Sequence, residues 1–185
     1  MKRIAGGTIV VLSLILLSAA ARLFPHPANV SPIAAIALLG GASLHLPWAL
    51  AAPGAAMLLS DLVIGFDRLP ITLSVYGSFF ASVFLGRWLR GRSSPWRTLG
   101  TALASSILFY LVTNAAVWWF SGLYAQTFDG LMLSYFYAIP FFRHTLLGDL
   151  GYTVALFWAY EYAPRLAIFS FRHQQSPSRQ HVSVR

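Results

Sequence analysis

The stretch FFRHTLLGDLGYTVALFWAYEY, residues 141–162, decides the fold class of this chain. It has the length and apolar character of a membrane helix, which needs about 20 residues, yet polar residues interrupt both of its ends: Arg143, His144, Asp149 and Glu161. A charge at the bilayer centre costs about 3 kcal/mol on insertion scales, and such residues usually face a partner or a water-filled cavity. We therefore predict a membrane span that begins at Arg143 and His144 on the outer side and ends at Glu161 on the inner side. Asp149 would face a ligand pocket.

The composition of the whole chain is that of a polytopic membrane protein. Of its 185 residues, 57% are hydrophobic and only 10% are charged, whereas a soluble domain carries roughly 25% charged residues. The absence of cysteine excludes disulfides and thiolate metal sites, and we expect no metal and no cofactor. The net charge of +8 comes from basic residues that fall between apolar segments, which indicates membrane topology and no nucleic-acid partner.

Six apolar segments predict an all-α membrane bundle of about six transmembrane helices. They cover residues 4–23, 31–45, 47–66, 70–88, 98–120 and 144–163. Each is near the length that a span needs, except the second, which is short. The apolar stretch 131–142 is too short to cross, so we expect an interfacial helix or a plug over the bundle. One domain would cover 1–168, followed by a disordered cytoplasmic tail at 169–185.

Basic residues predict the orientation of this bundle. With the N-terminus inside, ten arginines and lysines fall on the cytoplasmic side and only three fall outside: Arg22, Arg68 and Arg143. Cytoplasmic loops carry such an excess, so we predict a multi-pass protein of the bacterial inner membrane with both termini cytoplasmic. An alternative holds for the first segment, because MKR, an apolar run and SAAA also fit a secretory signal peptide, whose cleavage would leave five spans.

Polar residues recur at the predicted outer ends of the spans and predict a pocket open to the outside. The fifth span carries residues at four-residue intervals, which share one helix face: Ser106, Tyr110, Asn114 and Trp118. The sixth carries a similar face: Thr145, Asp149 and Tyr152. The predicted ligand-binding residues are His26, Asn29, Asp61, Tyr76, Asn114, Trp118, Arg143, His144, Asp149 and Tyr152.

Structural roles are the alternative for the charged members of this set. Asp149 and Arg143 would form an ion pair that fixes the sixth helix. Asp61 would accept a hydrogen bond from Ser60 or from Tyr76 on the next span. Both aspartates would then stabilise the bundle without touching a ligand.

Helix packing offers a further alternative for several residues. Asn114 in a span can hydrogen-bond between helices, and Trp118 fits an interfacial aromatic belt. Ala34, Ala37 and Gly41 have the small-residue spacing that lets helices approach closely in lipid. This face packs either within the chain or against another membrane subunit, and we treat it as a candidate docking face.

Enzyme motifs are missing from the sequence. There is no Walker A loop and no HExxH. LLGD, at residues 146–149, lacks the first glycine of the G-x-G-D motif of intramembrane aspartyl proteases. We therefore expect a protein that is not an enzyme.

The runs PHPANVSPIAAIALLGGA, MLLSDLVIGF, VYGSF, TNAAVW and IPFFRHTLLGDLGYT resemble an uncharacterised family of bacterial six-span membrane proteins across most of residues 22–162. In architecture the chain also resembles the S components of energy-coupling factor (ECF) vitamin transporters, among them the solitary cobalamin transporters. S components bind a vitamin or metal and associate with a transmembrane coupling subunit and two ATPases. The cobalamin branch ligates cobalt through a cysteine, which this chain lacks.

The resemblance implies a substrate-binding membrane subunit for uptake of a vitamin-like small molecule. The ligand would enter under a lid built from residues 121–142, and its partners would be the bilayer and a coupling subunit with ATPases. Two alternatives stand beside this function. A proton-coupled secondary carrier would use Asp61 and Asp149 as proton sites, and a structural subunit of a membrane complex would use only its small-residue faces.

Overall fold

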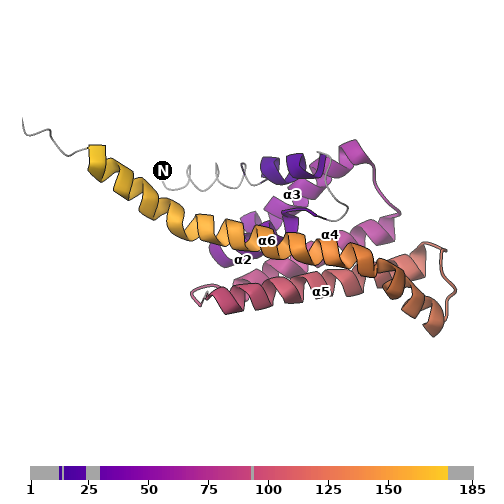
Figure 1. The fold of residues 1–185 in the computed structure, drawn as a ribbon. Coiled ribbons are helices and arrows are strands. Elements are labelled where there is room, and N and C mark those ends of the chain that lie inside the picture. Colours follow the sequence, from indigo (N-terminus) through magenta and orange to yellow (C-terminus); the bar gives the residue numbers. More distant parts are fainter. Residues whose placement is uncertain (1–12, 14, 24–29, 93, 175–185) are drawn as a thin grey trace, which may run out of the picture.

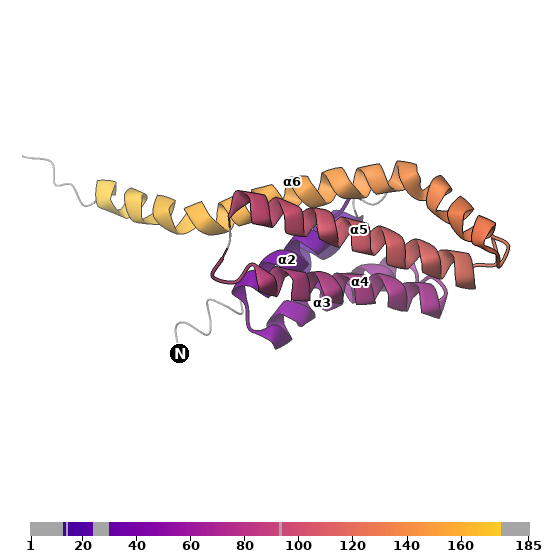
Figure 2. The ribbon, with the colours of Figure 1, turned by 90° about the horizontal axis from the view of Figure 1, so that it is seen from below.

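The computed structural model describes residues 13, 15–23, 30–92 and 94–174, with side chains up to residue 161. In this part of the chain every regular element is a helix. Residues 15–23 are helical and precede α2 (Ile33–Ser43), α3 (Leu46–Ile64), α4 (Leu69–Trp88), α5 (Pro95–Phe120) and α6 (Phe128–Gln174). The helices form a bundle in which α6 lies along α5 and runs past the other helices at its C-terminal end (Figure 1, Figure 2). The predicted all-α class is confirmed for the described residues.

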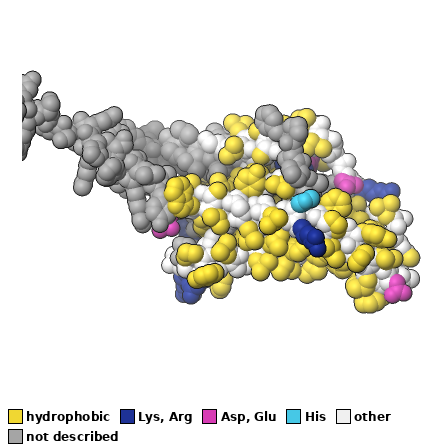
Figure 3. Space-filling model, viewed as in Figure 1, with side chains coloured by type: hydrophobic (Ala, Val, Ile, Leu, Met, Phe, Trp, Pro, Cys, Tyr) yellow, Lys and Arg dark blue, Asp and Glu magenta, His cyan; other side chains and the backbone are white. Residues whose placement is uncertain are grey.

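Three of the described helices, α3, α4 and α5, are long and apolar enough to cross a membrane. Each has proline in its first turn, where the missing N–H costs nothing. Large apolar side chains remain exposed on them, including Val63 at 71% and Leu69 at 70%, and hydrophobic side chains are spread across the described part of the face in Figure 3. Apolar surface of this extent is unusual for a soluble monomer, so it indicates membrane association.

The second predicted span, 31–45, is a short helix at the centre of the bundle. α2 has 11 residues, about 16 Å at 1.5 Å per residue, which is too short for a hydrocarbon core of about 30 Å. It contacts α3, α4, α5 and α6, and every residue from Ile33 to Gly41 is buried. α2 is therefore a core element around which the longer helices pack.

Small residues allow α2 to lie directly against α4. A Cβ added at Gly41 would lie 3.0 Å from the Arg87 nitrogen and closer still to the Val83 carbonyl oxygen. Ala34 is 3% exposed and Ala37 is 0% exposed. The structure therefore corrects the docking prediction for Ala34, Ala37 and Gly41, because all three pack within the chain and present no surface to another subunit.

The segment 131–142 and the predicted sixth span belong to one helix, which corrects the prediction of a separate interfacial helix or plug. α6 has 47 residues, about 70 Å. Pro140 lies inside it, and the N-terminal part of α6 bends relative to the rest (Figure 1), as expected where proline removes a backbone hydrogen bond. Arg143 and His144 consequently lie about four turns after Phe128 and do not begin the helix.

The ends of the chain fall partly outside the described residues. α6 continues to Gln174, so residues 169–174 of the predicted tail are helical, and 175–185 are not described. Residues 1–12 of the predicted first span are not described either. The part at 15–23 packs on the bundle, since Ile15 joins a core cluster with Ile36 of α2 and Ala52 of α3.

Candidate functional site

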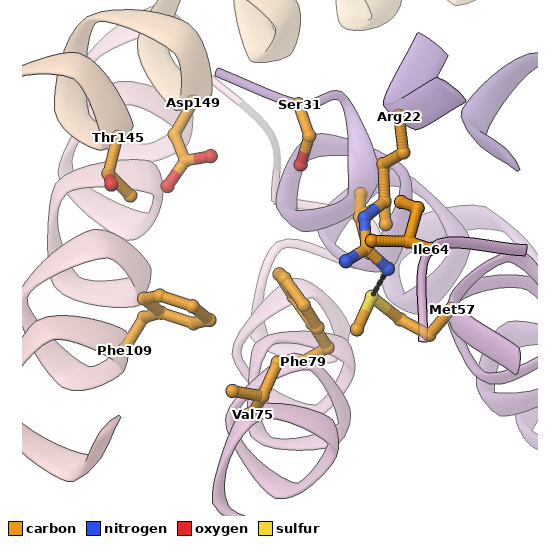
Figure 4. Close-up of a pocket in the computed structure, with 10 residues that line it drawn as sticks. Arg22, Ser31, Met57, Ile64, Val75, Phe79, Phe109, Thr145 and Asp149 are labelled. Atoms are coloured by element: carbon orange, nitrogen blue, oxygen red, sulfur yellow. Dashed lines mark hydrogen bonds between the residues drawn. The ribbon is translucent and has the colours of Figure 1, made fainter. Parts of the chain in front are cut away.

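A cavity of about 280 Å³ lies between the helical segment 15–23 and helices α2 to α6 (Figure 4). Most of its wall is apolar, and its two charged groups lie on opposite sides, with Arg22 on one wall and Asp149 on the other. Its lining residues are Arg22, Ser31, Ile33, Met57, Ile64, Val75, Phe79, Phe109, Thr145 and Asp149. We call this space the main cavity.

Arg22 connects the segment 15–23 to α3. Its Nη1 donates hydrogen bonds to Asp61 Oδ1 at 2.8 Å and to Ser60 Oγ at 2.6 Å, and it lies 2.9 Å from Met57 Sδ. The hydroxyl of Tyr76 on α4 donates to Asp61 Oδ2 at 2.9 Å. Both oxygens of the Asp61 carboxylate therefore have partners, and the cluster joins three helices.

This cluster confirms one prediction and changes another. The hydrogen bond from Tyr76 to Asp61 was predicted as a structural alternative. Arg22 was expected at the outer end of the first span with no partner assigned, and it forms an ion pair with Asp61, with side chains 22% and 9% exposed. The four-residue spacing of Ser18 and Arg22 puts both on one helical face, and Ser18 is fully buried.

Asp149 is almost enclosed, with 4% of its surface exposed. Its Oδ2 accepts a hydrogen bond from Ser106 Oγ at 2.7 Å. Ser106 lies near the middle of α5, so Asp149 lies beside the middle of that helix and not at its end, where the sequence predicted the pocket. Gly148 makes room beside it, because an added Cβ there would lie 3.2 Å from Val30 Cγ1.

The predicted ion pair between Asp149 and Arg143 is not formed. Arg143 is exposed, and six residues along a helix turn the side chain to a different face. The ion pair near the cavity is formed instead by Arg22 and Asp61. Among the described residues, Asp149 has a neutral hydroxyl as its hydrogen-bond donor.

The polar face of α5 is confirmed as a single face, and it packs on α6 and the segment before it. Tyr110 donates to the Tyr135 carbonyl oxygen at 2.7 Å, and Trp118 Nε1 donates to the Ala125 carbonyl oxygen at 2.8 Å. Ser134 donates to the Asn114 carbonyl oxygen at 3.4 Å. These contacts show that the stripe holds two segments together, and two of its members, Tyr110 and Asn114, also line a cavity.

A second cavity of about 220 Å³ adjoins the main cavity. Val75, Phe109 and Thr145 line both spaces, so these side chains separate them. Asn114 lines the second cavity only. The polar residue predicted from the middle of the fifth span is thus next to the site but outside the main cavity.

The structure therefore brings together only part of the predicted ligand-binding set. Asp149 lines the main cavity, while Asp61 and Tyr76 support Arg22 at its wall. Six described members line neither cavity themselves: Asp61, Tyr76, Trp118, Arg143, His144 and Tyr152. His26 and Asn29 lie outside the described residues.

The predictions missed the aromatic wall of the cavity. Phe79 of α4 and Phe109 of α5 contact each other with ring centroids 5.2 Å apart, and both line the main cavity. In an apolar span no local pattern distinguishes such a phenylalanine from one that faces lipid. Across the described residues, no three His, Cys, Asp or Glu side chains gather in a way that could hold a metal ion.

Comparison with known proteins identifies the family of the chain. A search of curated proteins and a search of solved structures each gave no match. The ECF likeness therefore finds no support there. A family model matches residues 2–172, and by this match the chain belongs to the family described as "Family of unknown function (DUF6580)".

Proposed function

We propose that the protein is a membrane-embedded binding protein that takes part in the uptake of a small water-soluble molecule. The observation that carries the proposal is the main cavity, with Arg22 and Asp149 on opposite walls of an otherwise mostly apolar space. Ligand sites are typically concave and apolar with a few convergent polar groups. Ionisable residues turned into the interior of a membrane bundle mark substrate or ion pathways.

The volume of the cavity limits the ligand. About 280 Å³ is just below the range of about 300 to 1,000 Å³ that holds drug-sized ligands. This supports a small vitamin precursor or a metabolite of similar size and speaks against a corrinoid. The proposal includes no ATPase-coupled partner, because the small residues expected to dock one are buried against α4.

Proton-coupled transport is a second candidate, and Asp149 favours it. Buried carboxylates in membrane bundles serve as proton relays, and this one is 4% exposed with a serine hydroxyl as its donor. In such a carrier Asp149 would exchange its proton as the ligand passes. Uptake that requires a proton gradient and is lost in D149N would support this candidate.

Mass spectrometry of the molecule released from purified protein tests the binding function. Wild-type protein, extracted in mild detergent and then denatured, should release a stoichiometric small molecule. V75F should release little, because the larger ring occupies the cavity that Val75 lines. V63F makes the same substitution at a residue that is 71% exposed and should release the wild-type amount.

Two results would argue against binding in the main cavity. Equal release from wild type and V75F would place the molecule elsewhere. Protein that is empty and also gains no thermal stability from any member of a metabolite panel would oppose the binding function itself.

A further inference from the structure

We infer that the ligand of the main cavity is a small organic cation, a protonated amine on an apolar body. This inference rests on the proposed binding function and names the chemical class of its ligand. It follows from the charge balance of the cavity, from the hydrogen-bonding capacity of its polar wall and from its aromatic floor.

The charge balance of the described wall is negative. Arg22 is compensated by Asp61, whose Oδ1 lies 2.8 Å from Nη1. Asp149 has no such counterpart, since its donor among the described residues is the neutral Ser106 hydroxyl. In a medium of low dielectric constant, a carboxyl group that is almost fully buried either takes up a proton or is stabilised as the anion by a positive partner. A ligand cation beside Asp149 supplies this charge.

The polar groups beside Asp149 present acceptors to the cavity. Thr145 lines the cavity one turn before Asp149, and its hydroxyl donates to the Phe141 carbonyl oxygen at 3.1 Å. The hydroxyl of Ser106 likewise donates to Asp149. With both protons already used, the oxygens of Thr145 and Asp149 accept from a ligand, and an ammonium group has up to three N–H donors to offer. The donors that line the cavity, Ser31 and Arg22, lie away from Thr145 and Asp149, so a carboxylate or phosphate ligand would be held on the other side of the cavity.

The aromatic wall fits the remainder of such a ligand. In Figure 4, Phe109 lies below Asp149 and Thr145, and Phe79 lies between Phe109 and the Arg22 side. Aromatic faces attract cations, most strongly where water is excluded, and they also give apolar contact. An amine held at Asp149 would therefore place its apolar body against Phe109 and Phe79.

Three probes of similar size and different charge test the inference. Benzylammonium is a cation, benzyl alcohol is neutral and benzoate is an anion, so a difference between them reports charge recognition. Binding to wild-type protein in nanodiscs would be measured by isothermal titration calorimetry at neutral pH. We expect measurable affinity for benzylammonium and at least about tenfold weaker binding of the other two, as for the loss of one hydrogen bond to a charged group.

Matched variants identify the group responsible. D149N keeps an acceptor for Ser106 and should lower benzylammonium affinity by at least about tenfold. D129N makes the same change at an exposed position in the first turn of α6 and should bind as wild type does. S106A keeps the carboxylate and should retain benzylammonium binding, which separates the charge of Asp149 from its hydrogen bond.

Every other outcome overturns the cation inference. Benzoate or benzyl alcohol that binds as tightly as benzylammonium, and is excluded by V75F, would leave the cavity as a ligand site but refute the charge preference. Benzylammonium binding that survives D149N would remove Asp149 from recognition. Failure of all three probes to bind also overturns the cation inference. That failure would count against the binding function itself only if the purified protein were also empty.

Discussion

The contact between α2 and α4 at Gly86 offers a stringent test of the central position of α2. A Cβ added at Gly86 would lie 2.8 Å from the Cα of Leu38 and closer still to its carbonyl oxygen. Real Cβ atoms keep at least 3.0 Å from such atoms. The neighbouring atoms are backbone, so no side-chain rotation relieves the contact, and the two helices must separate.

The expected cost of G86A follows from two opposing terms. Overpacking a well-packed core costs about 1 to 3 kcal/mol, and a backbone clash belongs at the upper end of this range. Replacing glycine by alanine within a helix returns about 0.5 to 1 kcal/mol. We expect G86A to lower the free energy of unfolding by about 2 kcal/mol.

G77A is the matched control, because Gly77 lies in the same helix and a Cβ there meets no atom within 4 Å. It should leave stability unchanged or raise it by up to about 1 kcal/mol. Unfolding would be followed in mixed micelles by the fluorescence of the six tryptophans as denaturing detergent is added. G86A that is as stable as G77A would refute the close approach of α2 and α4.

Two further predictions concern polar contacts between helices. R22M should lower the free energy of unfolding by about 3 kcal/mol, because it leaves the carboxylate of Asp61 without its cation. The double variant R22M/D61N should be more stable than R22M. Equal stability of the two variants in the same unfolding assay would show that the pair is not formed. Ser82 and Ser105 hydrogen-bond each other at 2.7 Å in the interior, and a double-mutant cycle with S82A and S105A should give a coupling of about 0.6 kcal/mol, whereas a coupling of zero would contradict the contact.

The sequence predicts the features that depend on local pattern. Continuous apolar runs identify α3, α4 and α5, because a helix that crosses lipid must be apolar along its length. The four-residue spacing from Ser106 to Trp118 placed these residues on one face of α5, which the contacts with α6 and with the segment before it confirm. What that face packs against is a tertiary property, and the spacing alone did not reveal it.

The features that sequence analysis missed depend on distant parts of the chain. Arg22 lies 39 residues before its partner Asp61. The local sequence shows only an arginine at the end of an apolar run, and the partner of that arginine could not be predicted from it. Pro140 usually ends a helix, yet α5 holds the chain on both sides of it, through Tyr135 before it and Phe142 after it. The spacing of Ala34 and Gly41 allows close helix packing both within one chain and between two chains, so the spacing alone could not tell which of the two occurs.

The central claim is that a hydrated cavity within the bundle admits small water-soluble molecules, and cysteine labelling at Thr145 tests it most directly. The chain has no cysteine, so T145C introduces a single thiol, at a position that is 7% exposed and lines the main cavity. T153C is the control, because Thr153 lies two turns further along α6 and is fully buried.

The reagent is a small, permanently cationic methanethiosulfonate applied to intact cells. The account predicts that T145C is labelled from outside, that benzylammonium slows the labelling, and that T153C does not react. A T145C variant that is inserted and folded but does not react from either side of the membrane, or reacts no faster than T153C, would contradict the account.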